Sequence, residues 1–287
     1  RRQRQMCIRD RNICMLLVAW LYCYGMHAQI IDKPNTPHYN ADSIRDELDK
    51  GPYFTLFKDN YFIGGTSIGH KPTKQNSDVK FQISISQRLT KSKLPFNSFL
   101  FIEYTQKAFW NVFEKSLPMV DLNFNPGIGL GHLIIHQNRY IGKAGILIEH
   151  ESNGKDSIYS RSWNRITFSG ALLIEKNLEI QFKTWIPIID GENNKDILKY
   201  CGIAQLATSY ISENQRWGFT TILTKRSGWN LNFNTILEFN FRLFPKENQY
   251  FFVQYYNGYG ECLLDYNKFR SRLRIGFVIK PRNFSNY

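Results

Sequence analysis

Residues 231–243, LNFNTILEFNFRL, alternate between apolar and polar side chains. The odd positions are mostly apolar and the even positions are mostly polar. Successive side chains of a β-strand point to opposite faces, so this pattern predicts a strand with one apolar face. Residues 269–277, FRSRLRIGF, repeat the pattern, with apolar odd positions and three arginines on the other face. The alternation predicts an all-β fold.

Similar segments of roughly ten residues, separated by turn residues, recur along the chain, which is the pattern of a transmembrane barrel. About twelve segments can be distinguished by their alternation. We expect strands at approximately 53–66, 78–89, 97–109, 121–133, 139–152, 160–174, 178–189, 198–211, 215–226, 231–243, 249–258 and 268–280. An even number of strands permits a closed antiparallel barrel without free edges.

A soluble β-sandwich would also alternate, but it would turn its apolar faces inward. Two features favour a transmembrane antiparallel β-barrel instead. The chain has a signal-like leader, and aromatic residues gather near the segment ends, as expected for interfacial girdles. On this interpretation the polar faces line the interior. There we expect these charged side chains to pair: Lys80, Glu238, Arg242, Arg270, Arg272 and Arg274.

The amino-terminal residues have the pattern of a secretory leader, in which a basic region precedes a short apolar run and a small residue. We expect a signal peptide at 1–28, with translation starting at Met6 or Met15. Residues 29–52 are polar and rich in proline and aspartate, and are expected to form a periplasmic arm. The barrel domain is expected at 53–287.

The chain is basic, with a formal net charge of +13. A basic protein can bind nucleic acid or anionic lipid, but these charges are scattered over alternating segments, so we expect no nucleic-acid partner. No run of eighteen apolar residues occurs, which argues against a helical membrane span. Cys201 lies in the predicted strand 198–211 and Cys262 just after the predicted strand 249–258; both are expected to be free thiols, although an oxidising compartment would permit a disulfide.

The polar motif at residues 150–165, HESNGKDSIYSRSWNR, interrupts this pattern. His150 and Ser152 are two residues apart, so they point to the same face if the strand continues through Ser152. A hairpin would return Asn164 beside His150. A base, a nucleophile and a neutral orienting group would then share one face of the sheet.

The alternation of the flanking segments shows which face this is. Before the motif, His150 and Ser152 share their parity with Ile146 and Ile148. After it, Asn164 shares its parity with Ile166, Phe168 and Leu172. All three polar groups are therefore predicted on the apolar, lipid-facing wall. Polar side chains are costly there and are functional candidates by default. A nucleophile in that position would meet a lipid substrate.

The run His-x-Ser-Asn-Gly, followed after five residues by Ser-Arg-Ser-Trp-Asn-Arg, resembles the signature of the outer membrane phospholipase A family. This family consists of twelve-stranded, calcium-dependent lipases of Gram-negative outer membranes. The resemblance covers roughly residues 50–280. Its supporting pieces are YTQK at 104–107 with Trp110, NFNP at 123–126, Lys199 with Tyr200, and GYGECLLDYN at 258–267.

The resemblance implies that Ser152 is the nucleophile, that His150 is the general base and that Asn164 orients the imidazole. We expect the oxyanion hole at the backbone amides of Asn153 and Gly154. The implied reaction hydrolyses the acyl esters of phospholipids at the sn-1 and sn-2 positions, and of lysophospholipids, through an acyl-enzyme. The implied location is the bacterial outer membrane, which the chain would cross several times.

The resemblance also implies a Ca2+ cofactor. Its expected ligands are the carbonyl of Lys155, where the family usually has arginine, the hydroxyl of Ser160 and a backbone oxygen near Ser116 of a second subunit. The active form would be a homodimer. Gln106 shares its parity with Tyr104 and so should face the lipid, where an amide needs a partner. We therefore expect Gln106 at the dimer interface.

Two other classes of protein are also compatible with the sequence. The first is a non-enzymatic porin-like or structural outer membrane barrel with a vestigial site, which would ignore a serine-directed reagent. The second is a soluble, basic lipid- or nucleic-acid-binding β-sandwich, which would be extracted without detergent.

Overall fold

The computed structural model describes residues 41–189, 191–244, 247–281 and 285–287. The expected signal peptide lies outside the described residues, as does the first half of the expected arm, residues 29–40. The described part of the arm contains helix α2 (Ala41–Asp49), and Asp49 binds the barrel through Arg88 and the backbone N–H of Ser92. No helix in the described part of the chain is both long enough and apolar enough to span a membrane.

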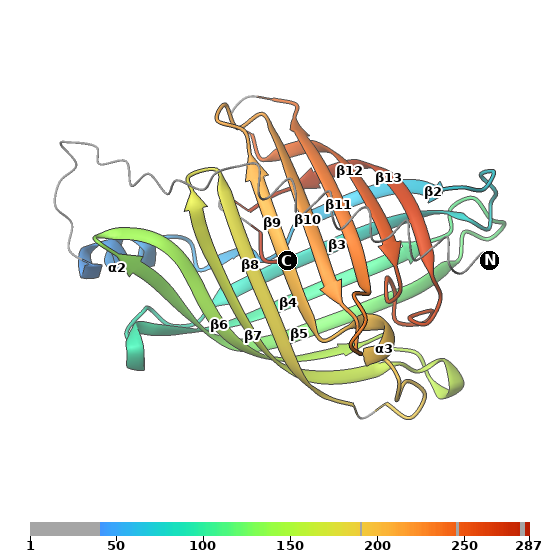
Figure 1. Cartoon of the computed structure of the whole chain (residues 1–287), viewed down its shortest axis with the longest axis horizontal. Coiled ribbons are helices and arrows are strands. Elements are labelled where there is room, and N and C mark those ends of the chain that lie inside the picture. Colours follow the sequence, from blue (N-terminus) through green and yellow to red (C-terminus); the bar gives the residue numbers. More distant parts are fainter. Residues whose placement is uncertain (1–40, 190, 245–246, 282–284) are drawn as a thin grey trace. The chain divides into compact units, whose positions relative to one another are not determined.

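Twelve antiparallel strands close into a barrel, as the alternation predicted (Figure 1). They are β2 (Asn60–Ser67), β3 (Ser77–Arg88), β4 (Ser98–Trp110), β5 (Met119–His136), β6 (Arg139–Ser152), β7 (Ser162–Glu175), β8 (Leu178–Ile188), β9 (Ala204–Ile211), β10 (Trp217–Lys225), β11 (Phe233–Arg242), β12 (Gln249–Gly258) and β13 (Arg270–Ile279). Neighbours in sequence are neighbours in the sheet. Pairing of β13 with β2 completes the ring.

Two of the predicted strands differ from the structure. The segment expected at 53–66 is divided into β1 (Phe54–Leu56) and β2, which pair with successive parts of β3. Between them, the N–H groups of Phe57 and Lys58 bond to the carbonyl and hydroxyl oxygens of Ser84. Side-chain alternation cannot reveal such a backbone interruption.

The segment expected at 198–211 begins as helix α3 (Leu198–Cys201), and β9 starts only at Ala204. The helix ends at Gly202, which has a φ of 90°. The apolar residues of this turn pack against a core formed by Trp163, Ile197, Leu263 and Tyr266. Tertiary packing therefore decides the conformation of a short apolar run that periodicity alone leaves ambiguous.

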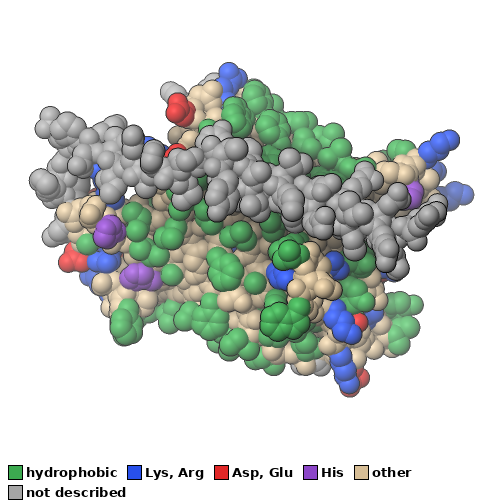
Figure 2. Space-filling view, in the orientation of Figure 1, with side chains coloured by type: hydrophobic (Ala, Val, Ile, Leu, Met, Phe, Trp, Pro, Cys, Tyr) green, Lys and Arg blue, Asp and Glu red, His purple; other side chains and the backbone are tan. Residues whose placement is uncertain are grey.

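The two faces of the barrel wall have opposite character. On β6, Ile146 and Ile148 are 48% and 61% exposed, whereas Glu149 and Glu151 are buried against the interior. Figure 2 shows apolar side chains spread over the visible outer surface. An apolar exterior around a polar interior is the arrangement of a barrel that spans a membrane.

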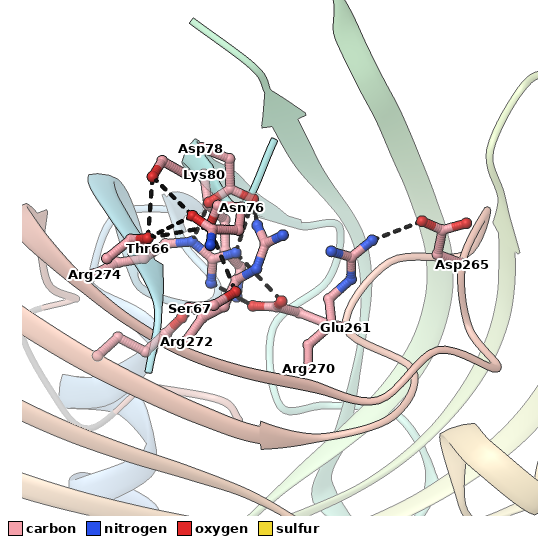
Figure 3. A network of polar contacts seen from close by, with 12 residues as sticks. Thr66, Ser67, Asn76, Asp78, Lys80, Glu261, Asp265, Arg270, Arg272 and Arg274 are labelled. Atoms are coloured by element: carbon pink, nitrogen blue, oxygen red, sulfur yellow. Dashed lines mark hydrogen bonds and ion pairs between the residues drawn. The ribbon is translucent and has the colours of Figure 1, made fainter. Parts of the chain in front are cut away.

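The interior contains a network of ion pairs, drawn in Figure 3. Arg274 bonds to Asp78 at 2.7 Å and to Glu261 at 2.5 Å, and Arg272 also pairs with Asp78. Lys80 donates to Gln254 at 2.9 Å and lies 3.4 Å from Glu261. These contacts join β3, β12 and β13 across the lumen.

The remaining charged side chains that were expected to pair also find polar partners. Arg270 bonds to Asp265 at 2.6 Å, and Glu238 accepts from Gln254 at 2.8 Å. Arg242 donates to the hydroxyl of Tyr250 at 3.2 Å. Cys201 and Cys262 are free thiols, as expected.

Replacing Arg274 by leucine should destabilise the barrel strongly, because it would leave Asp78 and Glu261 buried without their main counter-charge. We expect the free energy of unfolding to fall by about 3–5 kcal/mol. Denaturant unfolding in detergent measures this change. Arg242→Leu, which loses only contacts to a tyrosine, should cost clearly less. Equal losses in the two variants would contradict the role assigned to the network.

Candidate active site

His150 and Asn164 form the centre of the candidate site. They are directly opposite each other on neighbouring strands β6 and β7, and His150 Nδ1 lies 2.8 Å from Asn164 Oδ1. An amide oxygen only accepts hydrogen bonds, so Nδ1 carries the proton. In the neutral imidazole Nε2 is then the unprotonated nitrogen, with a lone pair that can accept a proton.

Ser152 is the last residue of β6 and follows His150 by two positions, so the two side chains share a face. That face is the outer one, because Ile146 and Ile148 of the same parity are exposed. His150, Ser152 and Asn164 are all half-buried on this wall. The three residues therefore lie on the same outer face of the two strands, as their parity predicted.

The chain leaves β6 through a tight turn built on Asn153 and Gly154. Gly154 has a φ of 62°, a conformation that favours glycine, and a Cβ at this position would lie only 3.0 Å from the Phe124 ring. Asn153 is only 2% exposed, and its side-chain nitrogen donates to the carbonyl of Tyr159 at 2.9 Å. Its side-chain oxygen accepts the backbone N–H of Arg161 at 3.0 Å. Asn153 thus ties together the two ends of the loop between β6 and β7.

One of the two amides expected in the oxyanion hole is already occupied. The backbone N–H of Asn153 donates to the carbonyl of Arg161 at 3.0 Å, which extends the ladder between the two strands by one bond. This corrects the expectation for Asn153. The amide of Gly154 lies beyond this ladder, in the exposed turn beside Ser152.

The oxygen groups expected to hold calcium lie on the same loop. Lys155 and Ser160 are half-buried near the two ends that Asn153 joins. The amine of Lys155 donates to the carbonyl of Val120 at 2.8 Å, so the ammonium group is bonded to the backbone of β5. Neutral oxygens on an irregular loop fit a hard cation that tolerates variable geometry and water ligands. No cluster of three or more His, Cys, Asp or Glu side chains suited to a metal occurs among the described residues.

Ser116 lies in the connection between β4 and β5, at the same rim as the loop after Ser152. It is exposed and has a φ of 70°. The neighbouring carbonyl, that of Leu117, accepts the indole N–H of Trp110 at 2.8 Å. Of these two adjacent residues, Ser116 is therefore the one better placed to offer a backbone oxygen to another molecule.

Gln106 points outward from β4, as its parity predicted. On the same strand Ile102 is exposed, whereas Glu103 and Thr105 are buried on the inner side. The hydroxyl of Tyr104 donates to Gln106 Oε1 at 3.2 Å. The amide is thus held against the outer wall in the middle of an apolar surface.

A further group of polar side chains, which the motif itself does not mark, lies directly behind the site. On the inner face, Arg165 pairs with Glu149 and, at 2.8 Å, with Glu151. The indole N–H of Trp163 donates to Glu151 at 3.1 Å. These residues flank His150 and Asn164 in sequence with the opposite parity. Their inward parity beside the motif is the sequence signal that points to them.

The chain forms a closed antiparallel barrel with an apolar exterior and a polar lumen, and its outer wall carries a histidine–asparagine pair beside a serine. These features define the class of protein to which it belongs. It is a multi-pass outer membrane protein with a candidate hydrolytic site that faces lipid. The family model described as Phospholipase A1 matches residues 58–279. The chain belongs to this family.

Individual relatives agree with this assignment. Phospholipase A1 of Escherichia coli strain K12 is 30% identical over 212 residues, which are 71% of this chain and 70% of that protein. The solved outer membrane phospholipase A of Escherichia coli superposes with a TM-score of 0.70 at 26% identity, over 79% of this chain and 98% of that one. The dimeric, calcium-bound outer membrane phospholipase of Salmonella typhi gives a TM-score of 0.71 at 26% identity, over 83% and 96%.

Proposed function

We propose that the protein hydrolyses acyl ester bonds of membrane phospholipids with Ser152, His150 and Asn164 as its catalytic triad. The observation that carries this proposal is the 2.8 Å contact between His150 Nδ1 and Asn164 Oδ1 on the lipid-facing wall beside Ser152. Asparagine orients the imidazole without bringing a second ionised group to the hydrocarbon boundary, where a carboxylate would be costly.

In the first step Ser152 Oγ attacks the acyl carbonyl carbon while His150 Nε2 takes the hydroxyl proton. The tetrahedral intermediate collapses, and His150 returns the proton to the departing alcohol oxygen of the lysophospholipid. In the second step His150 Nε2 takes a proton from a water molecule, which attacks the acyl-enzyme. The bond between the acyl carbon and Ser152 Oγ then breaks, His150 returns the proton to Ser152 Oγ, and the fatty acid is released. Both the sn-1 and sn-2 esters, and those of lysophospholipids, are substrates in this proposal.

The negative charge that develops on the carbonyl oxygen requires a donor. The backbone N–H of Gly154 is the group of this chain that we assign to it, since the N–H of Asn153 is used by Arg161. The left-handed conformation of Gly154 sets the direction of this amide. Beside it, the carbonyl of Lys155 and the hydroxyl of Ser160 would hold Ca2+, whose charge would help to stabilise the developing oxyanion.

A homodimer is the proposed active form. Gln106 lies on the outer wall, and Ser116 lies at the rim shared with the candidate calcium ligands. A second copy of the chain packed on this wall would partner the Gln106 amide and bring its own Ser116 toward Ser160. The calcium-bound relative from Salmonella typhi is likewise a dimer.

Ser152→Ala should reduce phospholipid hydrolysis in detergent micelles by at least about 10³-fold, because the nucleophile is lost. Asn164→Ala should reduce it by about ten- to a hundredfold, because His150 would lose its orienting acceptor. Ser98→Ala is the matched control, since Ser98 lies on β4 at the opposite rim. A sulfonyl fluoride should label the wild type once, at Ser152, in parallel with inactivation. A porin-like protein would show neither hydrolysis nor labelling.

Ser160→Ala should weaken calcium binding by about tenfold, because the site would lose one of few protein oxygens. Titration of the folded protein with Ca2+ in detergent, followed calorimetrically, measures this directly and does not depend on turnover. Ser157→Ala, three residues away on the same loop, should bind Ca2+ like the wild type. Unchanged affinity in Ser160→Ala would remove Ser160 from the proposed ligand set.

Gln106→Ala should weaken dimerisation and activity together, because the amide would no longer bond across the interface. Analytical ultracentrifugation in detergent measures the association, with a loss of about threefold or more in affinity expected for one hydrogen bond. Gln87→Ala provides an outward-facing glutamine on neighbouring β3 as the control. Equal self-association of Gln106→Ala and wild type would contradict the interface.

A further inference from the structure

The ladder between β5 and β6 has a gap directly behind the histidine. Phe124 pairs with Ser152 and Gly127 with Glu149, and this register places Pro126 opposite His150, where no pairing occurs. On its other side, His150 lies opposite Asn164. In an antiparallel sheet, the N–H and C=O of one residue point to the same neighbouring strand.

The carbonyl of His150 points toward β5. The hydrogen bond from Asn153 N to Arg161 O shows that odd residues of β6 bond to β7 at this end. The even residue His150 therefore directs its backbone groups toward β5, and its side chain closely approaches Asn164 in a non-hydrogen-bonded pair. Pro126 stands where the donor to the His150 carbonyl should be, and proline has no N–H.

A side chain supplies the missing donor. Asn125 Nδ2 donates to the His150 carbonyl at 2.9 Å. Asn125 is buried on the inner face of β5, so this bond reaches from the lumen to the backbone of the residue whose side chain faces the lipid. A carbonyl inside the wall without a hydrogen-bond donor would destabilise the fold, and the bond from Asn125 avoids this cost.

Arg165 fixes the orientation of Asn125. Its guanidinium donates to Asn125 Oδ1 at 3.4 Å while it pairs with Glu149 and Glu151. The amide oxygen is thereby directed to the arginine, and the amide nitrogen to the carbonyl. Glu149 and Arg165 are a cross-strand pair, and they come immediately before His150 and immediately after Asn164 in the chain.

We propose that Asn125, held by Arg165, is a positioning residue for His150. It replaces the backbone bond that Pro126 cannot make, and so fixes the distance and twist of β6 relative to β5 at the catalytic base. The inference rests on the proposed hydrolytic function. Neither residue touches substrate; both act from the lumen through the backbone of His150. Because the reacting groups must be held to well within 1 Å, the loss of this bond acts on the chemical step.

Asn125→Leu tests the proposal without changing any charge. We expect kcat to fall by about tenfold or more, while KM for a micellar phospholipid stays within about twofold of the wild type. The rate of Ser152 sulfonylation should fall by a similar factor, because it depends on the same base. Asn123→Leu is the matched control: Asn123 is equally buried, lies two residues earlier on the same face of β5, and bonds to Asp121 and Leu263 instead.

A rescue variant separates positioning from a general loss of stability. Pro126→Ala restores a backbone N–H opposite His150, so the double variant Asn125→Leu/Pro126→Ala should recover most of the lost kcat. If Asn125 only stabilised the fold, a backbone N–H at position 126 would not restore kcat. Folding of every variant is checked by its heat-dependent migration on gels.

Arg165→Lys supplies a second, independent test. Lysine keeps the charge, but a single ammonium cannot bond to Glu149, Glu151 and Asn125 together. A smaller fall in kcat, with KM unchanged, is expected. Arg274→Lys is its control in the other ion-pair network of the lumen.

Wild-type kcat in a folded Asn125→Leu barrel would overturn the inference, as would an equal loss in Asn123→Leu or a failure of Pro126→Ala to restore activity. Failure of the proposed function would give a different result in the wild-type protein. If wild-type protein neither hydrolyses phospholipid nor reacts with the sulfonyl fluoride at Ser152, the catalytic assignment itself is wrong.

Discussion

The structure depends on one constraint, which is that a backbone in hydrocarbon has no water to bond with its N–H and C=O groups. Twelve antiparallel strands satisfy it by closing on themselves, and β13 returns to β2 so that no edge remains. The same constraint applies at Pro126, which has no N–H to donate to the carbonyl of His150 on the neighbouring strand. A missing donor inside the wall must be replaced, and the side chain of Asn125 replaces it.

Closure also divides the side chains into two environments. Those that face outward meet lipid and are mostly apolar, whereas those that face inward form ion-pair networks around Arg274 and around Arg165. The candidate site combines both environments. His150 and Asn164 are polar groups on the apolar face, and the residues beside them in sequence belong to the buried network. The candidate site on the outer face and the ion pairs of Arg165 on the inner face therefore belong to the same two strands.

Much of the barrel and of the candidate site was predictable from the sequence, for a physical reason. A strand in a barrel wall exposes alternate residues to lipid and to the lumen, so polarity records the face of each residue. That signal placed His150, Ser152 and Asn164 together, and it also placed Gln106 outside. It failed at 198–203, where a short apolar run folds as helix α3, and at 57–59, where the backbone leaves the ladder.

The sequence by itself determined the strand pattern, the outward face of the motif and, through a long and specific run of residues, the family. The tertiary structure decided which backbone groups are already used. It assigned the N–H of Asn153 to Arg161, which leaves Gly154 as the candidate oxyanion donor. It also placed Asn125 and Arg165 behind His150. These contacts join residues 25 and 40 positions apart and depend on backbone direction, and local periodicity reports neither.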